Sequence, residues 1–205
     1  NQLESLPAIS QGEAIEEKFC QSKTLQDCLR STDKLTEKGV YFIHQKSEDF
    51  LSYADLYHEA LVILNGLQKI GLKKNDFFIF QFQDSLTYLK IFWACILGGI
   101  IPAPVNVPEI YETNSSQVQK LFNVISLLKN TSIITDRAIE VEAILKKNDV
   151  SAKVISYAEM LKGKENGKII SVNPEDSCLI LFTSGSTGVP KGVLLKHANI
   201  LSMSA

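Results

Sequence analysis

The segment from position 181 to 193 is the part of the sequence whose residue types and spacing suggest chemistry. Three glycines and four hydroxyl residues lie within the ten positions 183–192, together with Lys191, between two apolar runs. The oxygens of a polyphosphate need donors, which backbone N–H groups, hydroxyls and a cation supply. Glycine lets the backbone curve closely around an anion. We therefore predict that this segment binds a nucleotide's phosphates, with Lys191 as the charged contact and Mg²⁺ neutralising the remaining charge.

The spacing differs from that of a Walker A loop, which needs Gly-x-x-x-x-Gly-Lys-Ser/Thr leading into a helix. Gly185 and Gly188 are three positions apart, and the residues 192–195 after Lys191 are typical of a strand. We expect a hairpin loop between two strands, free to swing over the phosphates. The alternative is a solvated Ser/Gly turn without function, which the flanking strands and the Pro-Lys-Gly ending disfavour.

The elements that must position this loop are predicted from hydrophobic periodicity. Strands and helices alternate, and the strands are apolar on both faces. This pattern predicts an α/β fold, a layered sheet with helices on both faces. We expect helices at 24–38 (buried through Leu25, Cys28, Leu29 and Leu35), 53–70 after a Ser52 cap, 85–97 after an Asp84 cap, 117–129, 138–147 and 198–203, and strands at 40–43, 51–53, 77–82, 100–105, 132–135, 152–156, 178–182 and 192–195.

The composition excludes several classes of protein. The chain has 205 residues, of which 45% are hydrophobic and 21% charged, enough for a sizeable core and too apolar for intrinsic disorder. The net charge of −2 argues against a general nucleic-acid-binding surface. Glycines and prolines interrupt the most apolar run, 91–107, which is too short to span a bilayer, so we expect no membrane partner.

The four cysteines give no support to a metal site, because none forms a Cys-x-x-Cys pair. Cys28, Cys95 and Cys178 lie in apolar or helix-like contexts, where small buried thiols are expected. A reducing cytoplasm fits this pattern. The polar first residues indicate no signal peptide, and the initial Asn suggests that the chain was cut from a longer one.

Histidines and loop lysines are weaker candidates for function. We expect structural or exposed roles for His44 and His58. His197, six residues after Lys191, could cap the helix at 198–203, and a role near the nucleotide is the alternative. The pair at 73–74 is expected to be solvated, although it could face a carrier protein.

The loop residues from Thr183 to Gly192 closely resemble the phosphate-loop signature of the adenylate-forming (AMP-binding) superfamily. Three upstream segments, at 51–56, 71–76 and 92–104, resemble that family's "SYxxL" helix start, its "GLxxGD" turn and its "A/C-x-x-x-G-G-x-x-x-P" helix and strand. Asn75 stands where the turn usually has Gly. The sequence of residues 92–95 is most similar to the corresponding segment in adenylation domains of nonribosomal peptide/polyketide synthases and in fatty acyl-AMP ligases. The resemblance covers roughly 24–205, and 1–23 reads as a leader or linker.

The resemblance implies ATP-dependent activation of a carboxylic or amino acid as an acyl-adenylate, followed by transfer to a carrier protein's phosphopantetheine thiol. ATP, Mg²⁺ and that phosphopantetheine would be the cofactors, and the acid, a carrier protein and the rest of the adenylation domain the partners. We expect this chain to be the N-terminal subdomain, truncated after the phosphate loop and inactive alone. By position, the phosphates would contact Thr183, Ser184, Gly185, Ser186, Thr187, Gly188, Lys191 and Gly192.

Two alternatives stay open. One is a freestanding acyl-CoA synthetase, which uses the same adenylation chemistry but a different thiol. The other is a non-catalytic nucleotide-binding or interaction module, which the intact hydroxyls and Lys191 disfavour.

Overall fold

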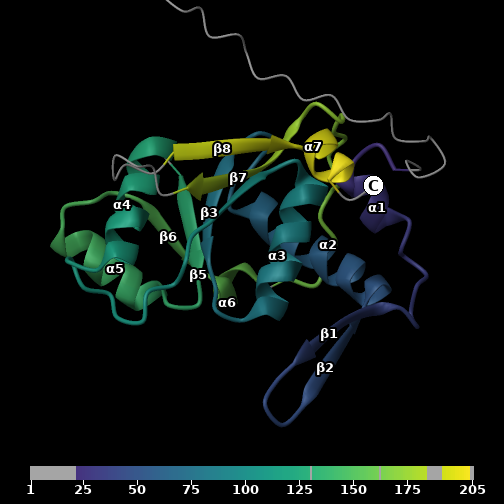
Figure 1. Ribbon diagram of the computed structural model, residues 1–205, viewed down its shortest axis with the longest axis horizontal. Helices are drawn as coiled ribbons and strands as arrows, with labels where there is room; N and C mark the ends of the chain where they lie inside the picture. Colours follow the sequence, from purple (N-terminus) through teal and green to yellow (C-terminus); the bar gives the residue numbers. More distant parts are fainter. Residues whose placement is uncertain (1–21, 130, 162, 184–190, 204–205) are drawn as a thin grey trace, which may run out of the picture.

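Strands and helices alternate along the chain in the computed structural model, which describes residues 22–129, 131–161, 163–183 and 191–203 (Figure 1). The predicted α/β class, with helices on both faces of a sheet, is confirmed. The elements are α1 (Leu25–Arg30), β1 (Gly39–Ile43), β2 (Glu48–Ser52), α2 (Tyr53–Lys69), β3 (Phe77–Gln81), α3 (Ser85–Gly98), β4 (Ile101–Pro104), α4 (Ser116–Leu128), β5 (Ser132–Thr135), α5 (Ala138–Lys147), β6 (Lys153–Ser156), α6 (Tyr157–Met160), β7 (Ser177–Thr183), β8 (Lys191–Lys196) and α7 (His197–Ser202).

A parallel sheet with the strand order β4-β3-β5-β6 forms the centre. Phe78 of β3 pairs with Pro102 of β4 on one side and with Ser132 of β5 on the other. Proline cannot donate to a strand ladder, so β4 suits the outer position in this sheet. The remaining strands form two antiparallel hairpins, β1–β2 and β7–β8.

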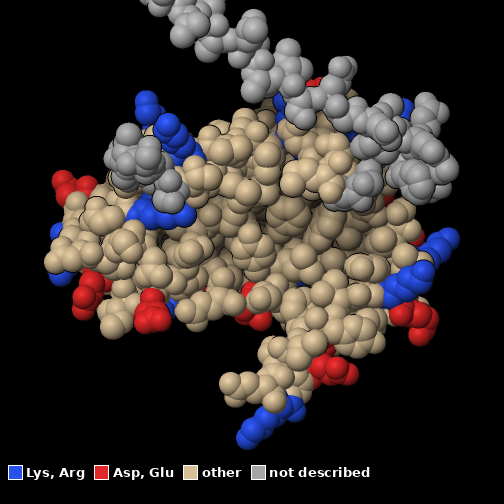
Figure 2. Space-filling view, viewed as in Figure 1, with Lys and Arg blue, Asp and Glu red and all other residues tan. Residues whose placement is uncertain are grey.

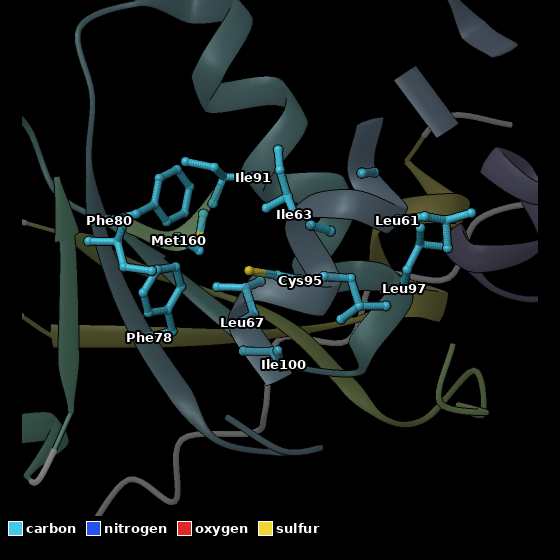
Figure 3. Close-up of a cluster of buried hydrophobic side chains, with 14 of the residues drawn as sticks. Leu61, Ile63, Leu67, Phe78, Phe80, Ile91, Cys95, Leu97, Ile100 and Met160 are labelled. Atoms are coloured by element: carbon cyan, nitrogen blue, oxygen red, sulfur yellow. The ribbon is translucent and has the colours of Figure 1, made fainter. Parts of the chain in front are cut away.

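The two faces of the parallel sheet bury alternate residues of the same strands, as strand geometry requires. Phe78 and Phe80 face α2 and α3, where Figure 3 shows them beside Ile91, Met160 and the thiol of Cys95. Ile79, between the two phenylalanines, packs in a second cluster with residues of α4, α5 and β7. Figure 1 shows α2 and α3 on one side of the sheet and α4 and α5 on the other.

Local sequence signals fix the two helices of the first face. The Ser52 hydroxyl accepts from the backbone N–H of Asp55 at the start of α2, and the Asp84 carboxylate accepts from that of Thr87 at the start of α3. Gly99 adopts the left-handed conformation that ends α3. The predicted caps of both helices are confirmed, and each helix ends within one residue of its predicted end.

The structure corrects the prediction for residues 24–38. The helix α1 ends at Arg30, and Leu35 is 39% exposed rather than part of a buried stripe. The hydroxyls of Ser31 and Thr32 donate to the carbonyls of Cys28 and Leu29, which satisfies the end of a short helix. The short helix α6 is an addition that the sequence analysis missed.

Asn75 occupies the turn position at which the family pattern usually has glycine. Its φ is 70°, in the left-handed region that asparagine tolerates better than other side chains do. The turn therefore keeps its backbone conformation without glycine. Among the described helices, none combines the length and apolarity that crossing a membrane would require.

Candidate functional site

The strands β7 and β8 pair as an antiparallel hairpin, which confirms the prediction that two strands flank the phosphate-loop sequence. Thr183, the last residue of β7, lies opposite Lys191, the first of β8. The Thr183 hydroxyl donates to the Lys191 carbonyl over 3.4 Å. These two residues define what we call the open end of the hairpin. Figure 1 shows the hairpin lying along one side of the parallel sheet.

The predicted phosphate-binding residues are only partly within the described chain. The structure places Thr183, Lys191 and Gly192 together at the open end of the hairpin. Ser184, Gly185, Ser186, Thr187 and Gly188 lie outside the described residues. Their role as phosphate contacts therefore stays a prediction.

The inner face of β7 anchors the hairpin. Cys178, Ile180 and Phe182 are all buried, and the last two join the cluster that lines the second face of the parallel sheet. Burial also raises the pKa of the Cys178 thiol to about 12, so this thiol stays protonated at neutral pH. Because β7 makes these contacts, the position of the open end is set by the core.

Gly192 has a packing role beyond the one that the sequence suggested. It pairs with Phe182, and a Cβ at position 192 would lie 2.9 Å from Cδ1 of Ile180 and 3.2 Å from Cε1 of Phe182. Both distances are shorter than ordinary contacts between carbon atoms. The absence of a side chain at Gly192 therefore lets the two buried side chains of β7 occupy this space.

The outer face of the hairpin offers an available cation and an apolar surface. Lys191 is exposed, and none of the acidic side chains in the described chain forms an ion pair with it. Leu181 and Val193, which pair across the strands, are 41% and 46% exposed. Figure 2 shows that few charged side chains lie over the hairpin and α3 in this view. A lysine opposite the hydroxyl of Thr183 fits the needs of a phosphate chain.

The base of the hairpin holds a polar network that the sequence analysis missed. Lys74, expected to be solvated, forms an ion pair with Asp176 at 2.7 Å and donates to the Ser171 carbonyl at 3.0 Å. The hydrogen bond from Lys74, helped by the backbone N–H of Asn173, lowers the pKa of the Asp176 carboxyl. These partners are about a hundred residues apart in the chain, so no local pattern could reveal them.

His197 also differs from its prediction. It is the first residue of α7 and Lys196 is the N-cap, so His197 does not cap the helix. The imidazole is 1% exposed, and its Nδ1 accepts from the backbone N–H of Leu25 at 3.2 Å. This contact joins the hairpin base to α1.

A separate polar network ties together the carboxyl ends of the parallel strands. The buried Gln81 side chain donates to the Asn106 carbonyl at 2.9 Å and accepts from the Tyr111 hydroxyl at 3.3 Å. The Arg137 guanidinium lies 5.3 Å from the centre of the Tyr111 ring and pairs with Glu140 at 3.1 Å. Because these groups satisfy one another, they hold the loops at the ends of β3, β4 and β5. Within the described residues, no group of three or more His, Cys, Asp or Glu side chains could hold a metal ion.

Comparison with protein families matches residues 32–205 to the model of a family described as AMP-binding enzyme. The long-chain-fatty-acid–CoA ligase 1 of Schizosaccharomyces pombe is 26% identical over 201 residues, covering 89% of this chain and 30% of that protein. Aspulvinone E synthetase melA of Aspergillus terreus is 31% identical over 134 residues, covering 62% of this chain and 14% of that protein.

Solved structures show the same similarity. The McyG A-PCP protein, in complex with phenylalanyl-adenylate, aligns with a TM-score of 0.83 and 41% identity over 88% of this chain and 29% of its own. The adenylation domain of a keto acid-selecting NRPS module, bound to keto acyl adenylate, aligns with a TM-score of 0.81 and 32% identity over 90% of this chain and 34% of its own. This chain spans about 30% of the length of the first curated relatives that it matches.

Proposed function

Because this chain belongs to the AMP-binding enzyme family, we propose that the protein activates a carboxylic or amino acid with ATP. An oxygen of the acid attacks the α-phosphorus, the bond from that phosphorus to the bridging oxygen breaks, and pyrophosphate leaves as the acyl-adenylate forms. The observation that carries this proposal is the pairing of Thr183 with Lys191 at the open end of an anchored hairpin.

The open end would act by positioning and by charge. Lys191 would contact the β- and γ-phosphates, and Mg²⁺ would neutralise the remaining charge. The same phosphates would be held by the hydroxyls of Thr183, Ser184, Ser186 and Thr187 and by the amides of Gly185, Gly188 and Gly192. The buried face of β7 supports this role, because a fixed base limits the positions that the loop can reach.

We further propose that the acyl group passes to the phosphopantetheine thiol of a carrier protein. The thiol sulfur attacks the acyl carbon, the bond to the AMP oxygen breaks, and the thiol proton goes to solvent. The likeness to the McyG A-PCP protein and to an NRPS adenylation domain supports this acceptor. The free thiols of Cys28, Cys95 and Cys178 support a reducing cytoplasm as the compartment.

A second candidate function, a freestanding acyl-CoA synthetase, is favoured by the similarity to the fatty-acid–CoA ligase of S. pombe. The two functions differ in the thiol. Supplying the full-length protein with ATP, a labelled acid and either a phosphopantetheinylated carrier protein or coenzyme A separates them. Label on the carrier supports the first function, and an acyl-CoA product supports the second.

We propose that residues 24–205 form the N-terminal part of an adenylation domain, with 1–23 as a leader or linker, and that this part is inactive alone. The exposed apolar pair Leu181 and Val193 supports the proposal, because a strand face of this kind usually packs against more protein. Robust ATP–pyrophosphate exchange by the chain 1–205 would contradict it.

The experiment that tests the proposed function is ATP–pyrophosphate exchange by the full-length protein with Lys191→Ala. Loss of a charged contact to the phosphates should lower kcat/KM for ATP roughly 100-fold. Lys153→Ala, at another exposed strand lysine, is the matched control and should leave exchange unchanged. An unchanged rate in Lys191→Ala would remove Lys191 from the site. If the protein is instead a non-catalytic nucleotide-binding module, calorimetry should detect ATP binding although no ATP–pyrophosphate exchange occurs.

A further inference from the structure

The start of α1 has a backbone donor that its own helix cannot satisfy. The first N–H groups of any helix lack partners within it. In α1 the Thr24 hydroxyl accepts from the N–H of Asp27, and the Asp27 carboxylate accepts from the N–H of Thr24. The N–H of Leu25 instead donates to Nδ1 of His197, 172 positions later in the chain. An imidazole from the far end of the chain thus completes the cap of α1.

The other side of α1 is fixed to α3. The Gln26 side chain is buried, and its Nε2 donates to the carbonyls of Ile96, Leu97 and Ile170 at 2.8, 3.0 and 2.8 Å. The Leu25 side chain packs with Ile96 of α3 and Cys178 of β7. Figure 1 shows α1 beside α7 at the base of the hairpin. The helix therefore bridges α3 and the hairpin base.

The imidazole can play this part only without a proton on Nδ1. Burial lowers the pKa of His197, with Lys74 acting in the same direction. The carboxylates of Asp176, before β7, and Asp27, on α1, act in the opposite direction. Protonation would place an N–H against the N–H of Leu25, and both groups are donors.

We propose that His197 is a positioning residue, whose imidazole ties the base of the β7–β8 hairpin to α1 and so fixes where the open end with Lys191 lies. The hydrogen bond to Leu25 and the burial of the ring carry this inference. The consequence for catalysis rests on the proposed function, whereas the tie itself does not. The bond breaks as pH falls. A histidine released from this contact takes up a proton at the ordinary histidine pKa of 6.5, whereas burial keeps the pKa of the bound histidine lower.

The first test is hydrogen exchange followed by mass spectrometry on the full-length protein, in peptides covering 23–31 and 191–203. After correction for intrinsic rates, protection in the wild type should fall by up to about tenfold between pH 7.5 and 5.5 in both peptides. His197→Leu keeps an apolar volume without an acceptor and should be poorly protected at both pH values. His197→Asn keeps an acceptor that does not titrate, so its protection should stay closer to wild type and should not depend on pH.

His58→Asn is the matched control, because His58 is exposed on α2 and should leave both peptides unchanged. Two results would overturn the proposal: wild-type protection in His197→Leu, or a pH dependence in His197→Asn equal to that of the wild type. Loss of protection confined to 23–31 would also overturn it, because the hairpin would then be positioned without the imidazole.

The second test measures ATP–pyrophosphate exchange at pH 7.5. His197→Leu should raise KM for ATP at least fivefold, and His197→Asn should restore most of the difference. An unchanged KM in His197→Leu would overturn the link to catalysis. If wild-type protein shows no exchange at all, the proposed function fails, and the hydrogen-exchange comparison still decides whether His197 holds the hairpin.

Discussion

The two hairpins of this protein have similar strand pairing and very different support. The β1–β2 hairpin projects from the body, and its outer residues Tyr41, Ile43 and Phe50 are 60%, 83% and 44% exposed (Figure 1). In the β7–β8 hairpin, one strand, β7, buries alternate side chains against the parallel sheet while β8 stays largely exposed. The hairpin with the phosphate-loop sequence is thus the one whose position the core dictates.

This difference teaches that hairpin geometry alone does not make a site. The rings of Tyr41 and Phe50 lie 4.8 Å apart across β1 and β2, a contact that stabilises the hairpin without fixing it to the sheet. Ile180 and Phe182 connect β7 to strands and helices of the second face. A loop that must meet a phosphate chain within a fraction of an ångström needs the second arrangement.

The largest expected difference between the hairpins comes from removing an aromatic ring in each. Phe182→Ala deletes a buried ring and should lower the free energy of unfolding by about 3–5 kcal/mol. Phe50→Ala removes a ring that is 44% exposed and should cost about 1 kcal/mol or less. Urea unfolding of the two variants measures both values. Equal losses would mean that the β1–β2 hairpin is anchored as firmly as β7–β8.

For substitutions of glycine the expected order is the opposite, with the larger loss of stability in the β1–β2 hairpin. A Cβ at Gly39 of β1 would collide with the Leu51 carbonyl oxygen and lie 2.7 Å from Cα of Ser52, both backbone atoms of the paired strand. At Gly192 the nearest atoms belong to the side chains of Ile180 and Phe182, which can adjust. Gly39→Ala should therefore cost about 3 kcal/mol and Gly192→Ala about 1 kcal/mol.

Thermal unfolding of Gly39→Ala and Gly192→Ala, followed by calorimetry under the same conditions, tests this prediction. The control is Gly71→Ala, where a Cβ meets open space and only the φ of +99° opposes it. A larger loss in Gly192→Ala than in Gly39→Ala would show that the interior of β7 is more rigid than its side-chain contacts suggest.

Most of the fold could be predicted because its signals are local. The Asp84 cap, the apolar stretch of α3 and Gly99 follow one another in the sequence and mark both ends of one helix. The strands of the parallel sheet are apolar on both faces because helices cover both. The region after Arg30 misled the prediction, since Leu35 continues the apolar spacing although it is 39% exposed and lies outside α1.

The hairpin of the candidate site could be predicted from the sequence, and the contacts that support it could not. Thr183, Lys191 and the strands that flank them follow from residue types within a dozen positions. The partners of the hairpin base do not, because Lys74–Asp176 and Leu25–His197 join residues that are far apart in sequence. An isolated histidine or lysine gives the same local signal whether it is solvated or buried in such a network.

The smallest expected effect comes from removing an exposed polar pair in each hairpin, and we expect the two losses of stability to be similar. Each carries an exposed polar side-chain pair: a hydrogen bond of 3.0 Å between His44 and Asp49 in β1–β2, and an ion pair of 2.7 Å between Lys196 and Glu175 at the base of β7–β8. Exposed pairs of this kind contribute about 0–1 kcal/mol, because water and salt screen them. Asp49→Asn and Glu175→Gln should therefore each change the urea midpoint only slightly, and less at high salt. A loss above about 2 kcal/mol in Glu175→Gln alone would mean that charge, in addition to the buried face of β7, holds the hairpin that we propose binds the nucleotide.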